Sequence, residues 1–357
     1  MKPFTKKLVL ENGKEFPGYG FGSNRVAVCE LVFNTSMVGY QEIVSDPTYA
    51  DQIVVMTYPL MGNYGFMDED YESKFPAMGG MVVRECCEAP SNFRYTKTMN
   101  ETFEELDIPG IAGVDTRMIT RIIREEGTQK AVIVDYAMPH DEAMKLIADS
   151  DLRHDQLERV SCKKRWFSRT PNHKYDIVAI DCGLKYNLIR SLNGCGCNVT
   201  VVPYSTSAEE ILSFNPHGVI VSNGPGAPTD VPEVVATVEA LKGRVPMFGI
   251  GLGHQIIALA YGAKCSRMTP GHRGGHPVKV LESGKILMTA QNHGYMVDEE
   301  SLKATELTTT HVSLLDGSIE GVEHKGHKVF AVEFQPESAP GPQDANYLFD
   351  KFIEMIK

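Results

Sequence analysis

The second half of the chain alternates apolar runs of strand length with stretches of helical pattern, and this alternation limits the possible fold more than any other feature. The apolar runs predict strands at residues 176–181, 199–202, 218–221 and 245–250. The stretches between them predict helices at residues 187–192, 208–214 and 232–241. Strands joined by helices form parallel sheets through right-handed crossovers. The sequence therefore predicts an α/β domain with a mainly parallel sheet over residues 175–357.

The first part of the chain has a different pattern. Residues 7–11 alternate between apolar and polar side chains, and Asn12-Gly13 is a strong signal for a hairpin turn. Residues 139–174 are polar and charged, as is typical of a bridge between domains. With 357 residues the chain is too long for one ordinary core. We therefore expect a β-rich N-terminal domain at residues 1–138, a linker at 139–174 and the α/β domain at 175–357.

The charge balance and the apolar runs exclude two classes of partner. The chain has 46 acidic and 35 basic residues and a net charge of -11, which opposes binding to nucleic-acid phosphates. No apolar run approaches the roughly 20 residues of a membrane span, and the N-terminal residues lack an apolar signal core. We expect a cytoplasmic protein that binds neither nucleic acid nor membrane.

Two kinds of cofactor motif are missing from the sequence. The eight cysteines do not have the spacing of a metal knuckle, which favours reduced thiols and no metal site. No phosphate-binding loop ending in Gly-Lys-Ser or Gly-Lys-Thr occurs. We expect no cofactor in this chain, and any chemistry that uses ATP would belong to a partner.

Sites in parallel α/β sheets lie at the carboxyl ends of the strands, which directs attention to the loop at residues 222–228. Its sequence is Ser-Asn-Gly-Pro-Gly-Ala-Pro. Gly224 and Gly226 free the backbone N–H groups to face an anion, as in an oxyanion hole or a carboxylate site. A tight turn without any function explains the same residues equally well.

A second segment, residues 248–255, combines a strand, a sharp turn and the start of a helix. Its sequence, Phe-Gly-Ile-Gly-Leu-Gly-His-Gln, has the layout of a nucleophile elbow, in which the central side chain is exposed on a strained backbone. That centre is normally Ser or Cys, and here it is Gly251. Glycine has no side-chain atom that could attack a substrate.

The third segment, residues 329–338, is a strand that leads into Gln335-Pro336-Glu337. In a Cys-dependent hydrolase a base and its orienting carboxylate converge on the thiol. Glu337 supplies a carboxylate, but Gln335 has an amide where the base would be needed. A carboxamide takes up no proton at physiological pH, so it cannot replace an imidazole.

These three segments, in this order, resemble the class I (triad) glutamine amidotransferases. Further motifs, spread over the whole chain, resemble one branch of that class, the carbamoyl phosphate synthetase small-subunit family. These motifs are Phe-Asn-Thr-Ser-Met at 33–37, Gly-Tyr-Gln-Glu at 39–42, Thr-Tyr-Pro at 57–59, Gly-Asn at 62–63, Gly-His-Arg-Gly at 271–274, Gln-Asn-His-Gly at 291–294 and Pro-Gly-Pro at 340–342.

The resemblance implies an N-terminal small-subunit domain and a C-terminal class I glutamine amidotransferase-like α/β domain. Relatives of this kind release ammonia from L-glutamine, and a large subunit combines the ammonia with bicarbonate to make carbamoyl phosphate for pyrimidine and arginine biosynthesis. The implied partner is therefore a large subunit, which would hold the ATP and Mg. By position, the implied glutamine-binding residues are Ser36, Gly224, Gly226, Leu252, Gln255, Asn292, Gly294 and Tyr295, of which Gly224 and Leu252 would offer backbone N–H groups to an oxyanion.

The departures from the family pattern concern catalysis. Gly251 stands where the family has its nucleophilic cysteine, and Gln335 stands where it has its histidine, so Glu337 alone matches the triad. Ala227 also replaces an aspartate of the Gly-Pro-Gly loop. Because both triad residues and the neighbouring loop have changed, natural loss is favoured over an engineered knockout.

Three hypotheses follow from these departures. The first is a small subunit, now a pseudoenzyme unable to hydrolyse glutamine, that supports an ammonia-dependent synthetase. The alternative is a non-catalytic regulatory or amino-acid-sensing paralogue. A third is an amidotransferase with a relocated nucleophile, for which Cys182 after the first strand of the α/β domain is the candidate; a packed core thiol explains Cys182 more simply.

Overall fold

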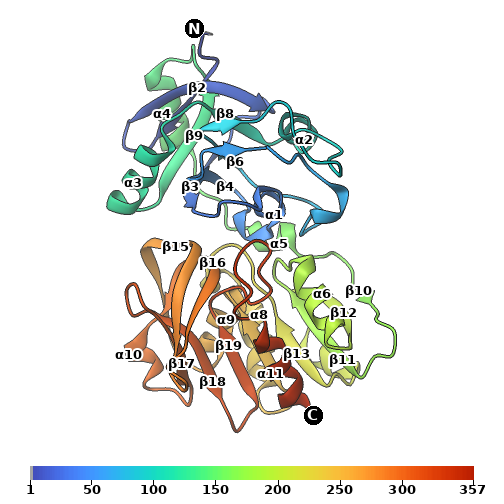
Figure 1. Ribbon diagram of the computed structural model, residues 1–357. Coiled ribbons are helices and arrows are strands. Elements are labelled where there is room, and N and C mark those ends of the chain that lie inside the picture. The colour runs from blue at the N-terminus through green and yellow to red at the C-terminus, as the bar shows by residue number, and fades with distance from the viewer. Residues whose placement is uncertain (1–2) are drawn as a thin grey trace. The chain divides into compact units, whose positions relative to one another are not determined.

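The computed structural model describes residues 3–357 and divides into two compact units, Met1–Arg153 and His154–Lys357. Figure 1 shows a small β-barrel unit and a larger α/β unit. Within the described residues, no helix combines the length and the apolar character needed to cross a membrane.

The first unit is built around a closed β-barrel in which the strands follow the order β1, β2, β8, β6, β4, β3, β9. The strands are β1 (Lys6–Leu10), β2 (Glu15–Gly22), β3 (Val28–Asn34), β4 (Gln52–Met56), β6 (Gly80–Val82), β8 (Pro109–Ala112) and β9 (Gln129–Asp135). β1 and β2 form the hairpin predicted at Asn12-Gly13, and Gly13 has the positive φ of 82° that such a turn requires. Leu8, Leu31 and Ile53 are fully buried in the barrel core.

Helices and short strands complete the first unit. They are α1 (Tyr40–Ser45), α2 (Met99–Glu105), α3 (Thr116–Glu126), α4 (His140–Asp149), the 3-10 turns η1 (Pro47–Tyr49) and η2 (Asp68–Asp70), and the paired strands β5 (Leu60–Met61) and β7 (Glu85–Cys86). α3 begins where the Asp115 side chain accepts a hydrogen bond from the Met118 N–H at 2.9 Å. Its apolar face, with Ile119 and Ile123, is buried in the barrel core.

The stretch at residues 139–174, which we expected to be a linker, contains three ordered elements. α4 belongs to the first unit and packs Ala143 and Ile147 against β9. The other two, α5 (Gln156–Val160) and β10 (Trp166–Ser168), belong to the second unit. β10 pairs antiparallel with β12.

The second unit contains a ten-stranded sheet in the order β10, β12, β11, β13, β14, β19, β18, β16, β15, β17. Five neighbouring strands are parallel: β12 (Cys197–Pro203), β11 (Tyr175–Asp181), β13 (Gly218–Val221), β14 (Met247–Ile250) and β19 (Val329–Val332). An antiparallel group extends the sheet on the far side of β19: β18 (Ile319–His324), β16 (Ile286–Val297), β15 (Cys265–Val280) and β17 (Thr308–Ser313). The α/β class is confirmed, with a parallel centre as predicted.

Helices cover both faces of the parallel part of the sheet. The strands there carry apolar side chains on both faces, and the helices bury them. The helices are α6 (Tyr186–Gly194), α7 (Ala208–Ser213), α8 (Pro232–Leu241), α9 (Leu252–Ala260), α10 (Glu299–Leu302), α11 (Tyr347–Ile356) and the 3-10 turn η3 (Pro228–Asp230). In β11, Val178 and Ile180 pack in the core that includes α8 and α9. Ile177 and Ala179 pack in the opposite core, with α6 and α11. The loops after β11, β13, β14 and β19 therefore meet at one edge of the sheet.

Candidate functional site

Gly251 forms the turn between β14 and α9 and has φ 55° and ψ -113°. Its N–H donates to the Val332 carbonyl at 2.8 Å, which joins the turn to the neighbouring strand β19. Its own carbonyl accepts from the N–H of His254 at 2.9 Å as α9 begins. A side chain at this φ would be strained, as at the centre of a nucleophile elbow. The elbow backbone predicted from the sequence is therefore present, and it holds a residue without a side chain.

Asn223, in the loop after β13, occupies the two backbone donors beside the elbow. Its Oδ1 accepts from the Gly224 N–H at 2.8 Å and from the Leu252 N–H at 3.0 Å. These are the two N–H groups expected to stabilise an oxyanion. A Cβ atom built on Gly251 would overlap Oδ1 and Cγ of Asn223 and lie 2.9 Å from its Nδ2. The Asn223 carboxamide thus fills both the donor pair and the space that a side chain at position 251 would need.

Gln335 and Glu337, after β19, meet a lysine instead of a thiol. Lys185 Nζ donates to Gln335 Oε1 at 3.0 Å and lies 3.2 Å from Glu337 Oε1. Lys185 also donates to the Ser338 carbonyl, and all three side chains are buried. A charged lysine only donates hydrogen bonds, and the Gln335 carboxamide is not protonated at physiological pH. This arrangement holds strands and loops together. Glu337 is its one group that could accept a proton, and that carboxylate is paired with Lys185.

The remaining residues expected to bind glutamine lie in three places. Gln255 on α9 donates through Nε2 to the Tyr295 carbonyl at 3.2 Å, so these two residues are in contact. Asn292, Gly294 and Tyr295 follow one another on β16. Ser36 lies in the first unit, where its N–H donates to Asn34 Oδ1 at 2.7 Å.

Gly226 is in the loop after β13 with φ 89°, a conformation in which glycine is favoured. In the same loop, a Cβ built on Gly224 would overlap the Cys182 carbonyl oxygen. Both glycines are therefore required by backbone geometry, whatever ligand the loop binds.

Glu333 and His254 form a buried pair that contacts Gln255. Glu333 Oε1 accepts from Gln255 Nε2 at 2.6 Å, and Glu333 Oε2 lies 2.6 Å from His254 Nδ1. Burial lowers the pKa of His254 to about 4 and raises the pKa of Glu333 well above its ordinary value. Because His254 is fully buried and bonded to Glu333, it is a structural residue of α9 and not a base at the elbow.

Cys182 is fully buried in the core that α8 and α9 share. Burial, with the nearby charges of Asp181 and Glu233, raises the pKa of its thiol far above the ordinary range. A nucleophilic cysteine needs a lowered pKa and access to solvent. Cys182 therefore has the properties of a packed thiol.

Sequence reasoning missed three contributors to this site: Asn223, Lys185 and Glu333. Lys185 and Asn223 follow β11 and β13 at the edge where sites are expected, so their position was a usable signal. Their roles depend on rotamers and on contacts between segments more than 25 residues apart in sequence, such as the 29 residues between Asn223 and Leu252. Glu333 lies directly after β19, and no local pattern distinguished it from a surface carboxylate.

Two family models match separate parts of the chain. The family model of the carbamoyl-phosphate synthase small chain, CPSase domain, matches residues 8–133, and that of the class-I glutamine amidotransferases matches residues 178–355.

Individual relatives align over nearly the full length. A carbamoyl phosphate synthase small chain of Staphylococcus epidermidis is 49% identical over 351 residues, covering 98% of this chain and 95% of the relative. One from Listeria innocua is 48% identical, with 99% and 97% covered. The carbamoyl phosphate synthase pyrimidine-specific small chain of Bacillus subtilis is 47% identical, with 99% and 96% covered. The chain therefore belongs to the carbamoyl phosphate synthase small chain family.

Proposed function

We propose that this chain is the small subunit of a carbamoyl phosphate synthase that uses free ammonia, and that the chain itself does not hydrolyse glutamine. The observation that carries the proposal is the position of the Asn223 carboxamide. Its oxygen bonds to the N–H groups of Gly224 and Leu252 and fills the space beside the bare Gly251.

Cys-dependent hydrolysis of an amide needs a thiolate, a base that activates it and donors for the oxyanion. Gly251 provides no thiol, and Gln335 provides no base. The donor pair is engaged by Asn223 before any substrate arrives. Loss of a catalytic triad typically lowers turnover by about a million-fold, so the chain has no useful route to ammonia of its own.

The features that remain are those of a scaffold. The buried Lys185–Glu337 pair ties the loop after β11 to the loop after β19. The Glu333–Gln255 bond ties the end of β19 to α9. Such internal bonds keep the carboxyl edge of the sheet in shape without a ligand, which suits a subunit whose role is to support its partner.

The partner would be a large subunit that holds ATP and Mg and joins ammonia to bicarbonate. The names of the relatives support this assignment, because each is the small chain of a carbamoyl phosphate synthase. The pyrimidine-specific relative supports a supply of carbamoyl phosphate for pyrimidine synthesis. Supply for arginine synthesis is a further part of the proposal.

The test is a comparison of nitrogen sources in the complex of this chain with its large subunit. Carbamoyl phosphate formation is measured with ammonium chloride, with amide-15N glutamine, and with both. We expect synthesis from ammonia, no 15N in the product, and no release of glutamate. Incorporation of 15N, or glutamate release that depends on this chain, would refute the proposal.

The amino-acid-sensing alternative makes a separate prediction. A glutamine-like ligand that bonds to the Gly224 and Leu252 N–H groups must displace Asn223 from them. Calorimetry of the isolated chain with L-glutamine should therefore give no heat of binding under the scaffold proposal. Replacing Asn223 by Gly would free the donors, and heat that appears only in this variant would identify Asn223 as the obstacle.

A further inference from the structure

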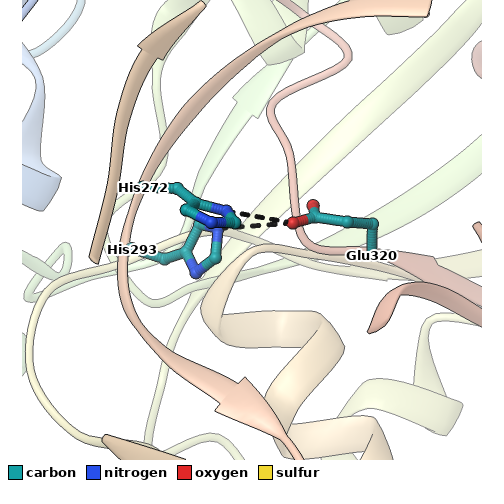
Figure 2. Close-up of side chains that lie close together, drawn as sticks. All are labelled: His272, His293 and Glu320. Carbon is teal, nitrogen blue, oxygen red and sulfur yellow. Dashed lines mark hydrogen bonds and ion pairs between the residues drawn. The ribbon is translucent and has the colours of Figure 1, made fainter. Parts of the chain in front are cut away.

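Three buried side chains with metal-binding atoms meet in the antiparallel part of the second unit. They are His272 on β15, His293 on β16 and Glu320 on β18 (Figure 2). His272 and His293 face each other as cross-strand partners, and β16 pairs with both β15 and β18. The proposed function uses none of these three side chains.

The spacing of the inner atoms fits a small cation. Glu320 Oε1 lies 3.2 Å from His272 Nδ1 and 3.9 Å from His293 Nε2, and all three donor atoms lie within 4.8 Å of one another. Ligand atoms placed about 2.1 Å from a tetrahedral zinc ion are about 3.4 Å apart. Two of the three separations bracket this value. The third, between the two imidazole nitrogens, is at most 4.8 Å and would shorten as the side chains close around an ion.

The outer atom of each side chain is bonded as in known metal sites, where outer partners fix the orientation of the ligands. His272 Nε2 lies 3.1 Å from Asp316 Oδ2. His293 Nδ1 lies 2.8 Å from the Tyr295 carbonyl, and Glu320 Oε2 accepts from Gln291 Nε2 at 3.0 Å. The other polar atom of each side chain, Nδ1 of His272, Nε2 of His293 and Oε1 of Glu320, lies on the inner side of the cluster.

His293 would need an N–H on both ring nitrogens to bond to its two neighbours, and a neutral imidazole has only one. Both of its ring nitrogens face oxygen atoms, the Tyr295 carbonyl at 2.8 Å and Gln291 Oε1 at 3.0 Å. Gln291 Nε2 donates to Thr289 Oγ1 and Glu320 Oε2, and these bonds fix Oε1 towards His293. A neutral imidazole carries a single N–H, so one nitrogen presents a lone pair to an oxygen. A cation at Nε2 removes this repulsion.

A proton on His272 is the competing explanation for the cluster. As an imidazolium, His272 would donate to both Glu320 and Asp316 and would satisfy both carboxylates. It would leave His293 as it is, with two acceptors and one proton. A metal ion would account for the surroundings of both His272 and His293.

We propose that His272 Nδ1, His293 Nε2 and Glu320 Oε1 bind a divalent transition-metal ion, with Zn²⁺ as the best chemical match. Two imidazoles favour such ions over Mg²⁺ and Ca²⁺, which prefer oxygen ligands. Gln291 Oε1, 3.0 Å from His293 Nε2, is placed to be the fourth ligand. Because all ligands are buried, the ion has a structural role and holds β15, β16 and β18 together.

The first experiment measures metal content. The full-length protein is stripped with a chelator, loaded with Zn²⁺ and dialysed, and bound metal is measured by mass spectrometry of the elements. Co²⁺ loading then reports the ligands through its visible d–d absorption. We expect one equivalent of metal, a tetrahedral Co²⁺ spectrum, and a rise in melting temperature of roughly 5–10 °C when free Zn²⁺ is 100 times Kd.

Three variants locate the ion. Asp316→Ala removes the half-exposed outer partner of His272 and should weaken Zn²⁺ binding by about 10–100-fold without unfolding the protein. Glu320→Gln removes an inner ligand and should weaken binding further. His324→Asn is the control, because His324 stacks on His327 beside Glu306 and forms a second possible metal-binding pair. It should leave the affinity unchanged.

Two outcomes would overturn the assignment. One is failure of the unmodified protein to retain Zn²⁺ or Co²⁺, which would leave the protonated His272 as the explanation of the cluster. The other is loss of the metal in His324→Asn together with full retention in Asp316→Ala and Glu320→Gln.

Discussion

Asn223 and Gly251 share one small volume at the carboxyl edge of the sheet. The turn at Gly251 keeps the backbone of an elbow, with φ 55°, although no side chain uses it. Asn223 turns inward and bonds to the two neighbouring N–H groups. The conformation of each residue depends on the other, because any Cβ at position 251 would overlap the carboxamide.

Gly251→Cys should therefore destabilise the protein and give no glutaminase activity. The cost combines backbone strain with loss of the two Asn223 hydrogen bonds when the carboxamide moves aside, and should total about 2–5 kcal/mol of unfolding free energy, measured by urea denaturation. Gly262→Cys is the matched control, because Gly262 has φ 92° and open space around its Cβ position, so only strain applies. Equal losses in the two variants would mean that Asn223 moves away freely.

Lys185→Met should destabilise the protein more than most single substitutions. It leaves the buried Glu337 carboxylate without the charge that lies 3.2 Å from it, at a typical cost of about 3–5 kcal/mol. Adding Glu337→Gln to Lys185→Met should recover part of the loss, because the unpaired charge is removed. Urea denaturation of the two single variants and the double variant measures this coupling, and strictly additive losses would argue against a buried ion pair.

At the scale of elements, the sequence predicted those whose signal is local. The helix at 232–241 and the strand at 218–221 occur with the predicted bounds, because an apolar run or a proline marks their ends. The long strands β15 and β16 gave no such signal. They carry His272, Arg273, Asn292 and His293 among their buried residues, so their faces do not alternate between apolar and polar side chains.

The close packing of α9 on β13 can be tested with Gly253→Ala, because helix propensity and steric overlap predict stability changes of opposite sign. Helix propensity alone would make Gly253→Ala stabilising by about 1 kcal/mol. A Cβ at Gly253, however, would overlap the Val221 carbonyl oxygen and lie 2.7 Å from its carbon. We expect a net loss in a urea-unfolding measurement. Gly194→Ala, at the end of α6 with nothing within 4 Å, should show no loss.

At the scale of the whole molecule, the sequence predicted two domains, and it has a glycine and a glutamine where the family has its cysteine and histidine. Gly251 and Gln335 are visible directly as residue types in the sequence. The Asn223 bonds and the His272–His293–Glu320 cluster depend instead on how segments far apart in sequence meet. Side-chain rotamers and strand register determine whether these side chains come into contact, and neither can be read from one sequence.

Stability should fall in mild acid, and buried His311 on β17 should account for part of the fall. Burial, aided by the charge of Lys351, lowers its pKa to about 4. Between pH 6.5 and 4 the unfolded chain binds a proton there that the folded chain does not, so folding is favoured less as pH decreases. His311→Asn should reduce this slope by up to about 1.4 kcal/mol per pH unit, measured by urea denaturation at each pH.

The positive φ of Gly251 also bears on how the chain could change over generations. A mutation that brings back the thiol alone would meet backbone strain and the Asn223 carboxamide, and Gln335 would still offer no base. The first step of a reversal therefore costs stability and yields no activity on which selection could act. Under the proposed function, a path to glutamine hydrolysis therefore requires changes at no fewer than three positions, Gly251, Gln335 and Asn223, before any activity could appear.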